Sequence, residues 1–147
     1  MRLYLDTSVL VAMLVREAGT AAAQACLAGA AAAPLLVSRW TATELSSALA
    51  LKLRMGWITA VEQEAALAMF RRLVASRLSM HDPVEADFDR ATRLCDQAAI
   101  PLRAGDALHM AVAKRLGARL ITFDAEMAAA ARYHGLAHEL LTVTPSS

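Results

Sequence analysis

The sequence predicts an α/β fold, with a mainly parallel central sheet flanked by helices on both faces. Two observations predict it. Short apolar runs alternate with longer segments of helical periodicity, and no repeat or linker interrupts the chain apart from a bias toward alanine. The 147 residues suffice for one domain with a complete core. We expect residues 1–141 to form this domain and residues 142–147 to be a flexible tail.

The strands are predicted from short apolar runs bounded by turn residues or acids. In chain order they are residues 3–5, 35–38, 78–81, 119–123 and 137–141. Helical segments separate them, which is typical of the strand–helix–strand units that build a parallel sheet.

The helices are predicted from apolar residues recurring with helical periodicity and from residues that begin or end helices. In chain order they are residues 9–16, 20–30, 41–54, 60–75, 85–98, 103–116 and 125–133. Thr20 is expected to cap the second helix, and Thr59 with Glu62 to form a capping box before the fourth. Gly56 and Gly117 lie just past two other helices, where glycine commonly ends a helix.

Composition argues against a membrane protein, although the hydrophobic fraction is 57% and the mean hydropathy +0.40. Much of that fraction is alanine, and no apolar run reaches the roughly 18 residues of a membrane span. The N-terminus lacks signal-peptide architecture because Asp6 interrupts it. Cys26 and Cys95 have no metal-type spacing and are interpreted as small apolar residues in a reduced, cytoplasmic compartment.

The charge pattern does not locate a nucleic-acid surface, because the formal net charge is only +1. Arginine outnumbers lysine, and its planar guanidinium suits phosphate recognition. Its clusters, Arg71–Arg72–Arg77 and Arg90–Arg93, are interpreted as solvated helix faces.

Four acidic residues lie near predicted junctions between a strand or loop and a helix: Asp6, Glu44, Asp106 and Asp124. In a parallel α/β sheet such junctions meet in the crevice at the carboxyl ends of the strands. Carboxylates crowded there would resist ionising unless a cation held them. We therefore expect all four to hold a hard metal ion, Mg²⁺ or Mn²⁺.

Each acid alone also has a purely structural explanation. Asp6 and Asp124 suit helix caps, and Asp106 suits the first turn of its helix. Glu44 fits the third position of a capping box begun by Thr41, an explanation at least as strong as metal binding for this residue. Their joint occurrence at junctions favours one shared site.

The segments around these acids resemble the PIN-domain nucleases, most closely the VapC-type toxins of bacterial toxin–antitoxin pairs. They are Leu3–Ser8, Ser38–Leu45, Leu102–Ala111 and Leu120–Asp124. The resemblance implies a Mg²⁺- or Mn²⁺-dependent endoribonuclease, a VapB-type antitoxin that inhibits it, a homodimer and a toxin–antitoxin hetero-oligomer. The four acids match the family's acidic quartet, and Ser8, Thr7 and Thr122 match small polar positions lining its site.

The metal hypothesis makes Asp6 and Asp106 direct ligands, while Glu44 and Asp124 bind through water or orient the attacking water. His109 lies one helical turn from Asp106, from which it could face the site, but packing or capping is its expected role. Two alternatives stay open. One is a phospho-acceptor or phosphatase domain, which usually needs a second acid beside the first and a late-strand lysine. The other is a non-catalytic module that binds a partner.

Overall fold

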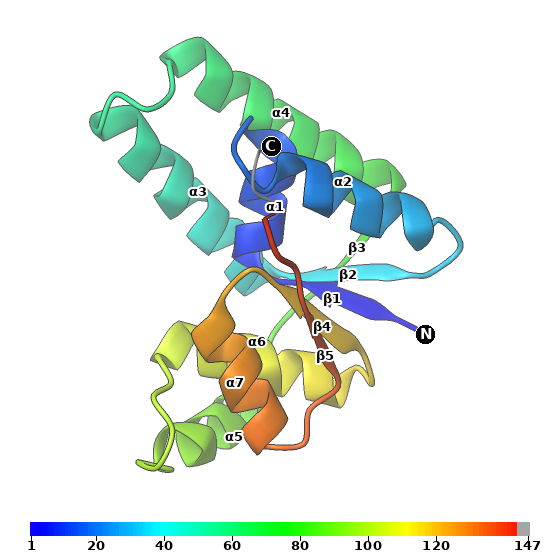
Figure 1. The fold of residues 1–147 in the computed structure, drawn as a ribbon, viewed down its shortest axis with the longest axis vertical. Coiled ribbons are helices and arrows are strands. Elements are labelled where there is room, and N and C mark those ends of the chain that lie inside the picture. The colour runs from blue at the N-terminus through cyan, green and yellow to red at the C-terminus, as the bar shows by residue number, and fades with distance from the viewer. Residues whose placement is uncertain (144–147) are drawn as a thin grey trace.

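The computed structural model describes residues 1–143, and Figure 1 shows the arrangement of their elements. The strands are β1 (Leu3–Leu5), β2 (Leu35–Ser38), β3 (Leu78–His81), β4 (Arg119–Thr122) and β5 (His138–Leu140). The helices are α1 (Thr7–Leu14), α2 (Thr20–Gly29), α3 (Arg39–Arg54), α4 (Ala60–Ser76), α5 (Glu85–Cys95), α6 (Ala104–Arg115) and α7 (Ala125–Tyr133).

The five strands form one sheet in the order β3-β2-β1-β4-β5, and every neighbouring pair is parallel. The expected fold class is therefore confirmed. The central strand β1 pairs with β2 on one side and β4 on the other, with Leu3 opposite both Leu35 and Arg119. The chain runs outward from β1 to β3 and then resumes at β4, so the strand order reverses between β1 and β4. This switch point is where an open α/β sheet binds ligands.

Two apolar layers cover the sheet because successive strand residues point to opposite faces. Leu3 and Leu5 of β1 pack with α1, α2, α3 and α4, whereas Tyr4 faces α5, α6 and α7. Figure 1 shows the first four helices on one side of the sheet and the last three on the other. Helix α6 is buried without interruption from Ala107 to Ala113, and its alanines allow this close packing.

Several helix boundaries differ from the predicted ones because the capping residue is another one. Helix α3 begins at Arg39, since Ser38 caps it and forms the capping box with Thr41. Gly19, not Thr20, is the N-cap of α2; the Thr20 hydroxyl instead accepts a hydrogen bond from the Glu17 amide at 3.0 Å. Helix α5 ends at Cys95, three residues before its predicted end at residue 98.

Other residues predicted to begin or end helices are confirmed in that role. Thr59 and Glu62 form the expected capping box of α4. Gly56 and Gly117 have φ angles of +74° and +62°, which glycine adopts without the strain a side chain would bring.

No helix in residues 1–143 is long and apolar enough to cross a membrane. Cys26 and Cys95 are free thiols. Of the expected tail over residues 142–147, Thr142 and Val143 have no regular structure and line a groove described below. Residues 144–147 lie outside the described part of the chain.

Candidate functional site

Elements from distant parts of the chain meet at the switch point between β1 and β4. Asp6 directly follows β1, and Asp124 follows β4 after one intervening residue. The Asp6 amide donates to the Ile121 carbonyl at 3.2 Å, which ties the two strand ends together. Glu44 reaches the same region from α3, and Asp106 from the first turn of α6. We call this region the acidic crevice and define it by these four residues.

Asp6 is the most buried of the four, with 3% of its surface exposed. Its carboxylate accepts hydrogen bonds from the Ser8 hydroxyl at 2.6 Å, the Val9 amide at 3.2 Å and the Thr122 hydroxyl at 2.5 Å. Burial raises the pKa of Asp6 above its ordinary value, while these hydrogen bonds oppose the shift. Asp6 is thus the N-cap of α1 and also a carboxylate fixed in the crevice. The cap explanation is confirmed for Asp6, and the shared-site explanation stays a prediction.

Ser8 connects Asp6 to the end of the neighbouring strand β4. Its hydroxyl donates to Asp6, and its oxygen accepts the amide of Phe123 at 3.0 Å. The Asp124 amide donates to the Thr122 hydroxyl at 2.9 Å, so Thr122 links the two acids. The hydroxyls of Ser8 and Thr122 therefore position the carboxylates.

Glu44 lies in the second turn of α3, because the helix begins at Arg39. It does not occupy the third position of the capping box, so the cap explanation for this residue is wrong. Its Oε1 accepts from the Thr7 hydroxyl at 2.7 Å and contacts His109 Nε2. Burial acts to raise the pKa of Glu44, but the hydrogen bond and charge of His109, with the Thr7 hydrogen bond, lower it below the ordinary value.

His109 faces the acidic crevice and contacts Glu44, so the expected packing or capping is not its whole role. It is 1% exposed, and its Nδ1 lies 2.8 Å from the Tyr4 hydroxyl while its Nε2 faces Glu44. Tyr4 in turn donates to the Ser38 hydroxyl at 2.9 Å, and burial raises the pKa of Tyr4 to about 12. The signal in the sequence is a polar residue inside the apolar run 107–113, since a buried polar group needs a partner.

Asp106 and Asp124 share one cation, the guanidinium of Arg103. Its Nε lies 3.4 Å from Asp106 and its Nη2 lies 3.1 Å from Asp124, although 75% of the Arg103 side chain is exposed. Burial raises the pKa of Asp106, Arg103 opposes this shift and the charge of Asp124 adds to it. Asp124 also caps α7, accepting the amides of Glu126 at 2.8 Å and Met127 at 3.2 Å.

Gly105 lets α6 approach α3 beside the crevice. A Cβ atom at this position would lie 3.0 Å from Glu44 Oε2 and 3.3 Å from the Trp40 ring. A side chain here would displace the Glu44 carboxylate or the indole. The glycine before Asp106 therefore has a packing reason.

The chemistry of the crevice fits a hard cation, although the side chains are not arranged around one. Within residues 1–143, no three His, Cys, Asp or Glu side chains gather closely enough to hold a metal ion. Mg²⁺, however, typically takes one or two carboxylates and completes its shell with water. Arg103 already bridges two of the carboxylates, which shows that positive charge is accommodated there.

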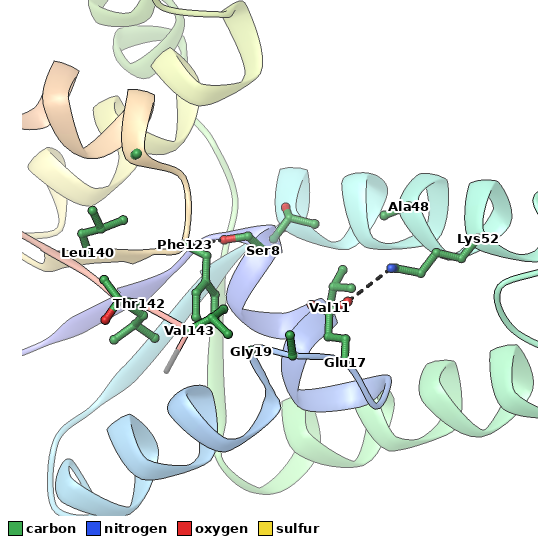
Figure 2. Close-up of a pocket in the computed structure, with 14 residues that line it drawn as sticks. Ser8, Val11, Glu17, Gly19, Ala48, Lys52, Phe123, Leu140, Thr142 and Val143 are labelled. Atoms are coloured by element: carbon green, nitrogen blue, oxygen red, sulfur yellow. Dashed lines mark hydrogen bonds and ion pairs between the residues drawn. The ribbon is translucent and has the colours of Figure 1, made fainter. Parts of the chain in front are cut away.

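A groove of about 680 Å³ adjoins the crevice, and Figure 2 shows its lining. Ser8 and Phe123 lie at the end nearest Asp6, and an ion pair of 3.2 Å between Lys52 and Glu17 lies farther along α3. Thr142 and Val143 form another part of the lining. The groove is mostly apolar and provides a path beside the carboxylates.

The sequence model of the PIN domain family matches residues 3–133, so the chain belongs to that family. No curated protein matches the sequence significantly.

Solved structures of toxin–antitoxin proteins have a similar fold. VapBC2 from Rickettsia felis, bound to a DNA fragment from its promoter, gives a TM-score of 0.73 at 17% identity, covering 97% of this chain and 100% of the other. VapC20 of Mycobacterium tuberculosis, a toxin that cleaves the sarcin–ricin loop, gives a TM-score of 0.68 at 18% identity, covering 87% of this chain and 94% of the other. FitAcB from Neisseria gonorrhoeae gives a TM-score of 0.65 at 22% identity, covering 92% of this chain and 95% of the other.

Proposed function

We propose that this protein is an endoribonuclease that acts as the toxin of a toxin–antitoxin pair. One observation carries the proposal: carboxylates from four separate elements lie around the switch point of a PIN-domain sheet, although within residues 1–143 no three of them gather closely enough to hold a metal ion. The similar folds of VapC20 and of the VapBC complexes support the same class of function. Within residues 1–143 the arrangement of a phosphatase is not present, since Thr7 and Ser8 follow Asp6, β4 has no lysine, and Lys114 lies at the far end of α6.

Asp6, Glu44, Asp106 and Asp124 would hold Mg²⁺ or Mn²⁺. The ion, when bound, would lower the pKa of a water and neutralise charge on the phosphate oxygens. Other residues of the chain position the carboxylates. Ser8 and Thr122 fix Asp6, while His109 and Thr7 orient Glu44. The Ser8 hydroxyl is held between Asp6 and the Phe123 amide, so no covalent nucleophile is proposed.

Arg103 would have to leave at least one carboxylate before a metal ion binds both Asp106 and Asp124. Its side chain is exposed and its two ion pairs are solvated, so moving it costs little. Arg103 also lies where the phosphate of a substrate would approach, and a guanidinium binds phosphate well. We propose that it turns from the carboxylates toward the RNA.

The proposed partner is a VapB-type antitoxin that lays a helix or an extended tail across α1, α2 and α3. It would place an Arg or Lys near Asp6 and Asp106. The contact between Arg103 and two crevice carboxylates supports this, because it is a guanidinium–carboxylate pairing of the same kind. A homodimer and a place in the bacterial cytoplasm, where RNA and antitoxin meet, complete the proposal.

Purified protein free of antitoxin tests the activity. RNA should be cut with Mg²⁺ or Mn²⁺ and left intact in EDTA, and Asp6→Ala should not cut it. Undiminished cutting in EDTA would exclude the metal-dependent mechanism. Mapping the cleaved ends in cells expressing the wild type and Asp6→Ala would identify the target.

The complex tests the partner. Changing the antitoxin's basic residue to alanine should restore nuclease activity in the purified complex. If that complex stays fully inhibited, the cation is not the inhibitor, and steric blocking of the RNA path accounts for inhibition.

A further inference from the structure

Two adjoining cavities lie on the α5–α6–α7 layer, toward the end of α6 that is remote from Asp106. The smaller, about 50 Å³, is lined by Arg90 of α5, Lys114 of α6 and His134 after α7, together with Leu94, Met110 and Leu136. The larger, about 260 Å³, shares Arg90 and His134 and adds Arg93, Gln97 and Tyr133. We call these side chains the basic pocket. They come from α5, α6 and α7 and from the residues that directly follow α5 and α7, which only the fold brings together.

His134 carries a buried nitrogen without a partner. Its Nε2 is inaccessible and forms no hydrogen bond within residues 1–143. Its ring packs edge-on against Tyr133, with ring centroids 4.9 Å apart. A buried polar nitrogen left unpaired destabilises the fold, so it indicates a missing ligand or water. The cavity it borders also contains two cationic side chains, which makes an anion a fitting ligand.

The cations of the basic pocket are uncompensated. Within the described chain, Arg90, Arg93 and Lys114 form no ion pair, whereas Arg39, Arg103 and Arg115 each pair with an aspartate. The acids on the three helices are Glu85, Asp87 and Asp89 on α5, Asp106 on α6 and Glu126 on α7, and Asp96 directly follows α5. None of these acids lines either cavity. The charge at the pocket is therefore positive although the whole chain is nearly neutral.

We propose that the basic pocket binds a backbone phosphate of the RNA, away from the phosphate that is cut. This rests on the proposed ribonuclease function. Arg90 and Lys114 supply the charge, and His134, whose buried Nε2 has no partner within residues 1–143, borders both cavities. The exposed ring of Tyr133 offers a face on which a base can stack.

The spacing suits a strand that also enters the acidic crevice. Asp106 and Lys114 are eight positions apart on α6, which is about 12 Å at about 1.5 Å per residue. At roughly 3.4 Å per stacked nucleotide, that is about three to four nucleotides. One RNA strand can therefore contact both sites, and the basic pocket would hold it in register while the crevice cuts.

Salt-dependent binding of a single-stranded RNA in EDTA tests this, because no cleavage occurs without metal in the proposed mechanism. The double variant Arg90→Gln/Lys114→Gln should bind more weakly, and the magnitude of its slope of log K against log salt should fall by about 0.7, the contribution of one phosphate contact on a single strand. His134→Leu should weaken binding with a smaller change in slope. The matched control is Arg71→Gln/Arg72→Gln on α4, which removes the same charge elsewhere and should leave the slope unchanged.

An unchanged slope in the Arg90/Lys114 variant would overturn the proposal, as would an equal fall of the slope in the control variant.

A second experiment titrates inorganic phosphate while the His134 ring signals are followed by NMR. Shifts of those signals with phosphate, together with an unchanged RNA slope, would mean that the pocket binds a free phosphate and not RNA. Cleavage by the wild type with Mn²⁺ is measured on the same preparation. If the wild type cuts RNA and the slope is unchanged, only this inference fails; if the wild type neither binds nor cuts RNA, the proposed function fails with it.

Discussion

The acidic crevice has two halves that are held in different ways. Asp6 and Glu44 are fixed by hydroxyl groups and by His109, all on buried or half-buried elements. Asp106 and Asp124 are bridged by Arg103, a side chain that is mostly exposed. The first half is therefore preorganised, while the second is held by ion pairs that solvent weakens.

This difference suggests a division of labour. A preorganised carboxylate can locate a cation without reorganisation of its surroundings, which is what a catalytic site needs. An exchangeable pair lets the cation enter, because an exposed guanidinium can be displaced. Substitutions in the first half should thus lower both activity and the order of the site, whereas those in the second half should separate activity from stability.

Asp6→Ala should have the largest effect. Activity should fall by more than about 100-fold, since even residues that only support a metal ligand contribute about 10–100-fold. The free energy of unfolding should also fall by about 1–2 kcal/mol, because α1 loses its N-cap. Glu64→Ala, an exposed acid on α4, is the control and should change neither RNA cleavage nor the urea-unfolding midpoint. Full activity in Asp6→Ala would remove the crevice from the mechanism.

Asp106→Asn should lose activity as well, but the metal-free fold should be as stable as the wild type or slightly more so. Burial raises the pKa of Asp106, so its ionised form is disfavoured in the folded state at neutral pH. The purely structural role predicts the opposite sign, since a first-turn acid contributes about 0.3–1 kcal/mol that substitution would remove. A clear drop in the Tm of the metal-free variant would therefore favour the helix-dipole role.

The same substitution has a signed pH dependence. A carboxyl group with a raised folded pKa stabilises the fold below its unfolded pKa, and that stability is lost as pH rises through the folded pKa. The Tm of the wild type should therefore improve relative to Asp106→Asn as pH falls from about 7 to about 4. Glu44, whose pKa is lowered, should behave oppositely: the stability it contributes is present above its unfolded pKa and is lost on acidification. A parallel pair of Tm curves for the wild type and Asp106→Asn would contradict the raised pKa.

The sequence predicted the sheet and its parallel strands, and it placed Asp6 and Asp124 at the ends of β1 and β4, because strand periodicity is a local signal. The shared site of the four acids stays a prediction. The sequence did not predict how the acids are held. The capping-box alternative for Glu44 was wrong because Thr41 and Ser38 are equally good caps, and only the structure shows that Ser38 is used. The bonds from His109 to Tyr4 and Glu44 span 105 and 65 positions, so helical periodicity alone could not reveal them.

His109→Gln should have an intermediate effect on activity. The buried ring connects Tyr4 to Glu44, and loss of a residue that orients a metal ligand typically costs about 10–100-fold. Glutamine can still donate to Glu44, so it should retain more activity than His109→Leu at matched stability. Mn²⁺ affinity, measured by EPR, should follow the same order. Equal losses in the two variants would mean that His109 acts by packing alone.

Arg103→Gln should have the smallest effect. The direction of its change in Mn²⁺ affinity tests whether the two halves of the crevice differ. Removing the guanidinium leaves Asp106 and Asp124 to repel each other, so Mn²⁺ should bind more tightly, by about fivefold at most because exposed ion pairs contribute little. RNA cleavage at saturating metal should nevertheless decline, since the variant lacks a cation beside the substrate phosphate. Arg39→Gln is the matched control: it removes a comparably exposed arginine from its pair with Asp82, outside the acidic crevice, and should leave Mn²⁺ affinity unchanged. If Arg103→Gln weakens Mn²⁺ binding, Arg103 orders the two carboxylates rather than competing with the metal, and both halves of the crevice are preorganised.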